Sequence, residues 1–221
     1  MERPVTEKKS LATGVLRNIR AKHVGSIQGI ENLSLEGPFL IAHNHGSFMD
    51  PILIAALCYP HLAGRSLCFV SQIFGMWSFL IRLLFKGRIR TLPIDPGDKG
   101  RVIEKAAACL TRGDIVAIAP EGPIISQDGP RKGKTGAARL ALRTGVPIVP
   151  AGIRIDRCQW HILHVLRWFF RPKDRAEVAF GKALRFGGPS EIPPARHLLD
   201  DVTMNIMHEI MKLCGKDYHE A

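Results

Sequence analysis

The stretch FLIAHNHGSFMDP, residues 39–51, joins an apolar run to a cluster of polar side chains. Its first four residues predict a short buried strand, and Gly46 supplies a bend soon after it. Pro51 is favoured in the first turn of a helix and biases the residue before it away from helical angles. The stretch therefore predicts a strand–loop–helix turn, with Asp50 as the N-cap of the helix.

His45 and Asp50 are the residues that such a turn would bring together. On one continuous helix they would lie roughly 140° apart, at about 100° per residue, and could not meet. Across a turn, the carboxylate can orient the imidazole, as a general base requires. The H-x4-D spacing is by itself weak evidence, because Asp50 could simply cap a helix and His45 could satisfy a backbone carbonyl.

A metal site is a second interpretation of the same stretch. His43 and His45 would point the same way from a strand, but a hydrolytic zinc centre needs a third ligand. The other histidines contain a single further paired spacing, His161 and His164, in an aromatic-rich segment. We therefore expect no metal.

The composition indicates a globular chain with an anionic partner. The 221 residues are 46% hydrophobic, and one domain over residues 1–221 is the default expectation. A net charge of +11 favours nucleic acid, an acidic membrane face or a phosphorylated substrate. No RNA-binding, zinc-finger or helix-turn-helix pattern is visible, so we expect lipid or phosphate and no nucleic acid. Five cysteines without CxxC spacing favour reduced thiols in the cytosol.

The pattern of apolar segments predicts peripheral contact with a membrane. No apolar run approaches the roughly 18 residues needed to span a bilayer, and the start of the chain does not resemble a secretory signal. Residues 8–23 predict a basic amphipathic helix, and residues 159–171 mix aromatic and basic side chains. Each is expected either to pack on the core or to lie at a membrane interface. The expected location is the cytoplasmic face of a membrane.

Strand and helix patterns alternate along the chain. Such alternation predicts an α/β fold with a mixed, mainly parallel sheet flanked by helices. Reactive loops in such sheets follow the carboxyl ends of strands, so His45 and Glu121 are expected to share one crevice. Two prolines in the strand pattern at 145–153 predict an edge position or unusual pairing. Expected strands cover 39–42, 67–70, 114–119, 145–153 and 177–182, and expected helices cover 51–58, 73–86, 98–112, 133–143 and 196–214.

Four motifs occur in a fixed order. They are NHGSFMD at 44–50, PEG at 120–122, KTGAARLA at 134–141 and VPIVP at 146–150. Together they resemble the glycerolipid (lysophospholipid) acyltransferase family, to which 1-acylglycerol-3-phosphate acyltransferases belong. The resemblance covers residues 29–182, between a basic N-terminal segment (1–23) and a C-terminal helix (196–214).

The resemblance implies a glycerolipid acyltransferase-like α/β fold and a thioester-dependent O-acyl transfer. An acyl group would pass from acyl-CoA or acyl-carrier protein, as co-substrate, to the hydroxyl of a lysophospholipid. His45 would be the general base, and Asp50 would hold its tautomer and stabilise its protonated form. No cofactor is implied, because the thioester is already activated. Backbone N–H groups near the helix start would stabilise the oxyanion.

The resemblance also implies substrate contacts for Asn44 and Ser47 and an acceptor-site turn at Glu121 and Gly122. The chain departs from the family at two arginines that hold the acceptor's phosphate: Pro96 follows Asp95, and Pro-Ile-Ile occupies 123–125. Either other cations hold the phosphate, or the acceptor has none. The expected replacements are Arg88, Arg90, Arg131 and Lys132.

Two alternatives to an acyltransferase stay open at this stage. One is a metal-dependent hydrolase using His43 and His45, and the other is a non-catalytic lipid-binding protein on the same scaffold. The expected partners of the acyltransferase are an anionic membrane surface, a lysophospholipid acceptor and the acyl donor.

Overall fold

The computed structural model describes residues 11–47, 49–71, 82–95, 97–122, 132–155, 175–187 and 194–215. Its helices are α1 (Leu11–His23), α2 (Asp50–Cys58), α4 (Lys99–Thr111), α5 (Gly136–Thr144) and α7 (Arg196–Leu213), with short 3₁₀ helices at Ile30–Leu33 and Tyr59–His61. Its strands are β1 (Val24–Gln28), β2 (Leu40–His43), β3 (Leu67–Ser71), β4 (Ile89–Pro93), β5 (Ile115–Ile118), β6 (Ile148–Arg154) and β7 (Ala176–Phe180).

The seven strands form one sheet in the order β1-β7-β6-β2-β5-β3-β4. All neighbouring strands run parallel except β6 and β7, which are antiparallel. The expectation of a mixed, mainly parallel sheet is therefore confirmed. Because β2 and β5 are adjacent and parallel, the loops that follow them leave the same edge of the sheet.

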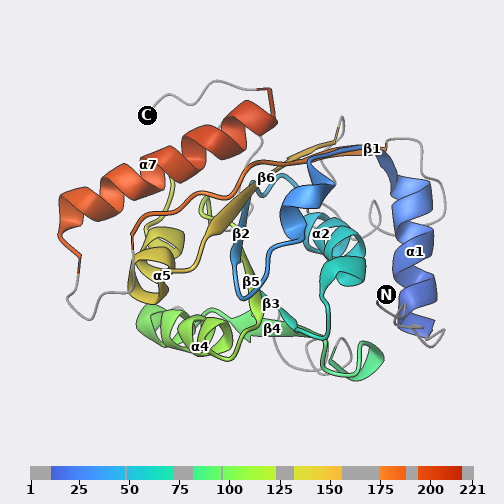
Figure 1. Ribbon diagram of the computed structural model, residues 1–221, viewed down its shortest axis with the longest axis horizontal. Coiled ribbons are helices and arrows are strands. Elements are labelled where there is room, and N and C mark those ends of the chain that lie inside the picture. Colours follow the sequence, from blue (N-terminus) through green and yellow to red (C-terminus); the bar gives the residue numbers. More distant parts are fainter. Residues whose placement is uncertain are drawn as a thin grey trace.

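Helices cover both faces of this sheet, as Figure 1 shows. On one side, α1 and α2 pack over a core that includes Leu53, Ile54 and Leu57. On the other side, α4, α5 and α7 pack over a second core that includes Leu140 and Ile206. The strands between them are nearly continuous apolar runs, as expected for a sheet buried on both faces.

Strand β6 lies inside the sheet, so of the two expectations for its prolines the edge position was wrong and the unusual pairing is observed. It pairs with β2 in parallel and with β7 in antiparallel orientation. Pro150 lies where the regular pairing of β6 with β7 has ended. Ala151 is paired with Phe180 on one side of it, and Ile148 forms a separate bridge with Leu184 on the other. This irregular point tolerates a proline. The Pro150 carbonyl still accepts a hydrogen bond from the Gly181 N–H, at 2.8 Å. Pro150 thus takes part in the pairing of β6 with the β7 segment through its carbonyl alone.

Several element boundaries differ from expectation for local reasons. The helix expected from 133 begins at Gly136, because the Lys134 N–H donates to the Pro120 carbonyl. The helix expected from 98 begins at Lys99, with the Asp98 carboxylate capping it by accepting from the Arg101 N–H. The expected segments at 1–10, 73–81 and 159–171 lie outside the described residues.

Helix α1 turns its apolar side to the protein. Ala12, Leu16 and Ile19 are buried, and the helix packs against α2. At its end, the Arg175 guanidinium donates to the carbonyls of Ala21 and Val24, which joins α1 to the start of β7. The apolar side of the described part of this helix is thus part of the core. None of the helices within the described ranges combines the length and apolar character that crossing a bilayer requires.

His23, the last residue of α1, makes the stability of the fold depend on pH. It is buried, and burial together with the nearby Lys22 and Arg175 lowers its pKa to about 4. The unfolded chain therefore takes up this proton first as the pH falls below about 6.5. As the pH is lowered from 8 to 5, the free energy of unfolding of the wild type should fall by about 2 kcal/mol because of His23. H23Q lacks this group and should not show that part of the fall.

Denaturant unfolding at several pH values measures this difference. H208Q is the control, because His208 on α7 is exposed and should give the wild-type pH dependence. Parallel stability curves for wild type and H23Q would contradict the assignment.

Candidate active site

The loop between β2 and α2 brings His45 and Asp50 into contact. Asp50 is the first residue of α2 and not its N-cap, which is Met49. Its carboxylate turns back into the loop, where Oδ2 accepts from the Ser47 N–H at 2.8 Å and lies 3.2 Å from His45 Nδ1. The expected pairing of imidazole and carboxylate is therefore present, and the expected capping role is replaced by these loop contacts.

The two partners differ sharply in exposure. The Asp50 side chain is 1% exposed, whereas the His45 side chain is 20% exposed. A buried carboxylate needs hydrogen-bond donors, and the positive end of the α2 dipole favours it further. Because an ionised carboxylate only accepts, Nδ1 of His45 is the donor. Nε2 is then the ring nitrogen left to take a proton.

His43 is buried on the other side of this loop. Its Nδ1 lies 2.7 Å from the Asn44 carbonyl, and its ring centroid is 6.2 Å from that of His45. Burial lowers the pKa of His43 despite the nearby Asp50 charge, which keeps the ring neutral. Among the described residues, no group of three potential metal ligands includes either histidine. The hydrolase interpretation thus lacks a third ligand in the part of the chain that is described.

The turn after β5 reaches the same loop. The Glu121 carboxylate accepts a hydrogen bond from the backbone N–H of His45, at 3.2 Å. The next residue, Gly122, has a positive φ of 84°, and a Cβ there would come within 2.8 Å of Lys134 Cε. His45 and Glu121 therefore meet at this edge of the sheet, as expected, and the positive φ of residue 122 favours glycine there.

Asn44 and Ser47, the expected substrate contacts, bond to the protein itself. The Asn44 side-chain amide donates to the Ile153 carbonyl at 2.8 Å, and its oxygen accepts from the Ile153 N–H at 2.7 Å. Ser47 is buried, and its Oγ accepts from the Met49 N–H at 3.1 Å. Both side chains hold the shape of the loop.

Arg88 and Arg90 are not brought to His45. Arg90 pairs in register with Cys68 of β3, which is level with Leu40 at the beginning of β2. Three strand spacings, about 14 Å, separate β4 from β2. The Arg88 guanidinium lies 5.3 Å from the centroid of the Tyr59 ring, and Arg90 Nε donates to the Gly87 carbonyl. The phosphate role of these two arginines stays a prediction, which their distance from His45 does not favour.

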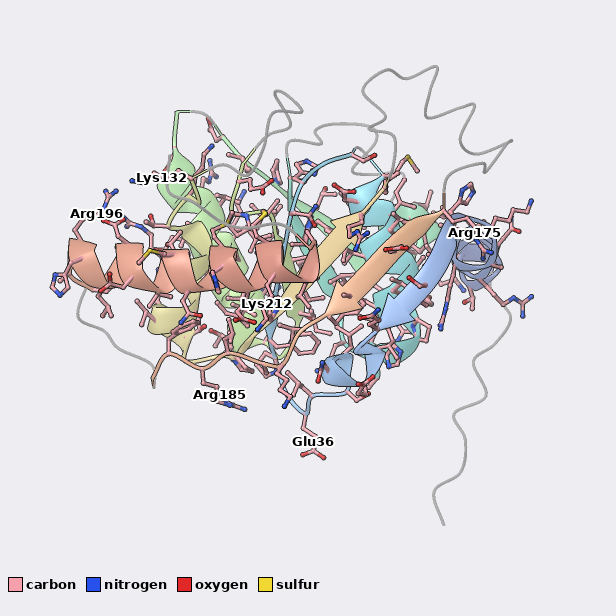
Figure 2. All side chains as sticks on the ribbon, turned by 90° about the horizontal axis from the view of Figure 1, so that it is seen from above. Glu36, Lys132, Arg175, Arg185, Arg196 and Lys212 are labelled. Carbon is pink, nitrogen blue, oxygen red and sulfur yellow. The ribbon has the colours of Figure 1, made fainter. Side chains whose placement is uncertain are left out.

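The remaining expected cations follow the turn after β5. Arg131 lies outside the described residues, and Lys132 is exposed. Figure 2 shows Lys132 at the same end of the molecule as Arg196, with Arg175 at the opposite end. Positive charge is thus found at both ends of the molecule and is not confined to one patch.

Lys134 is the cation that the sequence-based site omitted. Its side chain packs on Gly122, next to the carboxylate that holds the His45 backbone. The residue stands in the KTGAARLA motif, so the motif was a signal for it, but the contact arises only when the chain returns to the turn after β5. Lys134 places an ammonium group beside the candidate catalytic loop.

The helix start offers fewer oxyanion donors than expected. The N–H of Ser47 donates to Asp50 Oδ2, and that of Asp50 donates to the Ser47 carbonyl. The N–H of Met49 donates to Ser47 Oγ. These three donors are used inside the loop, so the expected oxyanion role is not supported for them.

A partly exposed imidazole, a buried carboxylate and an acidic turn meet at the carboxyl ends of strands in a mixed sheet. Enzyme sites of α/β proteins lie at this position. A family model for acyltransferases matches residues 26–154, more than half of the 221 residues. The chain belongs to the acyltransferase family. The matched region contains β2, the His45–Asp50 loop, the Glu121 turn and β6.

Relatives of known activity are similar over part of their length. A chloroplastic 1-acyl-sn-glycerol-3-phosphate acyltransferase of Brassica napus is 33% identical over 129 residues, covering 56% of this chain and 35% of that protein. The 1-acyl-sn-glycerol-3-phosphate acyltransferase of Bacillus subtilis is 31% identical over 125 residues, covering 55% and 58% respectively. The chain thus spans between about a third and 58% of the length of these two relatives.

A solved structure supports the fold. The crystal structure of the 1-acyl-sn-glycerophosphate acyltransferase PlsC from Thermotoga maritima superposes with a TM-score of 0.56 at 20% identity, covering 98% of this chain and 86% of that one. This likeness confirms the expected acyltransferase-like fold.

The two hydrogen bonds between the Asn44 side chain and the Ile153 backbone should contribute to the stability of the fold and not to substrate affinity. N44A leaves one backbone donor and one acceptor of β6 without their partner and should cost about 2 kcal/mol of unfolding free energy. Thermal and denaturant unfolding measure this loss. N205A, on the exposed side of α7, is the matched control and should unfold as the wild type does. A raised KM for the acceptor with unchanged stability would instead make Asn44 a substrate ligand.

Proposed function

We propose that this protein transfers a fatty acyl group from acyl-CoA or acyl-carrier protein to the hydroxyl of a lysophospholipid such as 1-acylglycerol-3-phosphate. The observation that carries this proposal is the contact between His45 Nδ1 and Asp50 Oδ2 at the carboxyl end of β2. It is supported by membership of the acyltransferase family and by similarity to 1-acyl-sn-glycerol-3-phosphate acyltransferases.

The proposed reaction needs one base and no covalent enzyme intermediate. The acceptor hydroxyl attacks the thioester carbonyl while His45 Nε2 takes its proton. Asp50 holds the ring with Nδ1–H turned inward and stabilises the imidazolium that forms. The proton then passes to the departing thiolate as the carbon–sulfur bond breaks. Glu121 keeps the His45 backbone in place by accepting its N–H.

Lys134 is the proposed replacement for the missing phosphate-binding arginines. Its ammonium lies over the Glu121–Gly122 turn, beside the loop that carries the base. Within the described residues, no carboxylate forms an ion pair with it. A lysine binds phosphate as a point charge and does not form the two-pronged contact of an arginine. The acceptor class we propose is therefore one with a phosphate near the reacting hydroxyl.

We also propose that the protein works while bound peripherally to an anionic membrane surface. The net charge of +11 supports this proposal, because basic surfaces are attracted to acidic lipid headgroups. The exposed Arg17 and Lys22 on α1 add positive charge on the side of the helix away from the core.

Replacing the base should remove nearly all turnover. H45A should lower the rate of acyl transfer about 10²- to 10⁴-fold, because a positioned general base contributes that much. The assay incubates protein with radiolabelled acyl-CoA or acyl-carrier protein and a panel of lysolipids, and identifies the product. H208A, at an exposed position on α7, is the control and should keep the wild-type rate.

Retention of more than about a tenth of the rate by folded H45A would contradict the proposed base. Lysolipid binding by the wild type without consumption of either thioester would support the non-catalytic interpretation instead.

Removing the Lys134 charge should act on phosphate-bearing acceptors. K134A should raise the KM for 1-acylglycerol-3-phosphate roughly 10- to 100-fold, in keeping with a charged hydrogen bond. The KM for a monoacylglycerol, which lacks phosphate, should change little. K105A, an exposed lysine on α4, is the matched control. An equal rise for both acceptors would mean that Lys134 supports the turn without binding phosphate.

Membrane association should be electrostatic. Binding to vesicles that contain acidic phospholipid should weaken as the salt concentration rises from about 0.05 to about 0.5 M. This range spans the concentration, near 0.1 M, at which the electrostatic screening length is about 10 Å. Co-sedimentation with acidic and with neutral vesicles measures this effect. Salt-independent binding would show that apolar contacts, and not charge, hold the protein on the membrane.

A further inference from the structure

Two cysteines and an aspartate meet on the far side of the sheet from α1 and α2. The Sγ atoms of Cys68 and Cys109 and a carboxylate oxygen of Asp114 all lie within 4.8 Å of one another. Cys68 and Cys109 are buried, at 0% and 3% exposure, and the Asp114 side chain is 13% exposed. The three residues come from β3, the last turn of α4 and the turn that leads into β5.

Hydrogen bonds hold Cys109 and Asp114 in position, and the pairing of β3 with β4 and β5 holds Cys68. The N–H of Asp114 donates to the Cys109 carbonyl at 3.0 Å, which fixes the turn between α4 and β5. The Asp114 Oδ1 atom accepts from the Ser66 N–H at 3.1 Å, just before β3 begins. Arg112 Nη2 lies 3.2 Å from Cys109 Sγ and 3.3 Å from Asp114 Oδ2. The cluster is thus preorganised by backbone contacts and not only by side-chain packing.

The spacing of the ligand atoms suits a tetrahedral metal. Ligands about 2.3 Å from a zinc ion lie about 3.8 Å from one another, so the present separations need to shorten by at most about 1 Å. Two thiolates with one carboxylate form a soft ligand set, which selects zinc over magnesium or calcium. Three protein ligands leave a fourth position for water.

The charges in the cluster also balance when a divalent ion is bound. Two thiolates and one carboxylate carry three negative charges, and a divalent ion with the Arg112 guanidinium carries three positive charges. Charge balance matters here because both sulfurs are almost fully buried. An N–H donor to a ligand sulfur is a common outer-sphere partner of metal sites, and Arg112 occupies that position.

We propose that Cys68, Cys109 and Asp114 form a zinc-binding site that joins α4 to β3 and β5. The site is separate from the candidate active site, because Cys68 is level with Leu40 at the beginning of β2 whereas His45 lies beyond the end of that strand. A metal bound there ties the last turn of α4 to the sheet. The proposal does not depend on the acyltransferase activity.

Cobalt(II) is the probe that tests the site, because thiolate coordination gives it a charge-transfer absorption in the near ultraviolet. Full-length protein is reduced, treated with a chelator, freed of both reagents and titrated with Co²⁺. The wild type should bind one equivalent with this absorption, and Zn²⁺ should displace it. C109A and D114N should weaken Co²⁺ binding at least about tenfold. C58A, which removes a buried cysteine in α2, should bind like the wild type.

D114N is included in case C109A fails to fold. Asparagine has nearly the same size as aspartate, so weaker Co²⁺ binding by D114N would reflect the lost carboxylate. Circular dichroism of each variant shows that it is folded. No thiolate absorption in reduced, folded wild type would overturn the proposal, as would an absorption unchanged in both C109A and D114N. Protein purified without reductant could instead contain a disulfide between Cys68 and Cys109. If that protein bound no Co²⁺ after reduction, the proposal would also be overturned.

Discussion

The buried carboxylate of Asp50 is the interaction on which the candidate site depends. It accepts from the Ser47 N–H and lies against His45 Nδ1, so one group shapes the loop and also orients the imidazole. A carboxylate this buried is stable only with such donors around it. The same requirement that closes the loop therefore leaves Nε2 of His45 as the ring nitrogen that we propose takes the proton.

The rest of the fold keeps that pair in place from three directions. Strand β6 holds the loop through the paired hydrogen bonds between Asn44 and Ile153, and the turn after β5 holds it through Glu121 and the His45 N–H. Helix α2 carries Asp50 at its first position. Because β6, β2 and β5 are neighbours in the sheet, all three supports meet at one edge.

Features that depend on neighbouring residues in the chain could be predicted from the sequence, and features set by distant contacts could not. Apolar runs and glycine or proline positions indicated β2, α2, β5 and the turn that joins His45 to Asp50. The interior place of β6 could not be inferred, since it depends on a distant segment, β7 and Gly181, that pairs with Pro150 through its carbonyl alone. The strand order likewise decides that Arg90 lies far from His45, and the contact of Lys134 with Gly122 forms only in the folded chain.

The tautomer of His45 tests this account most directly. Nitrogen-15 NMR of the folded protein, with the resonance assigned by comparison with H45A, distinguishes which ring nitrogen carries the proton when the imidazole is neutral. The account predicts a proton on Nδ1 and a bare Nε2, with the preference reduced in D50N. A proton on Nε2 of the neutral ring in the wild type would contradict it, because Nε2, the proposed base, could then not accept a proton.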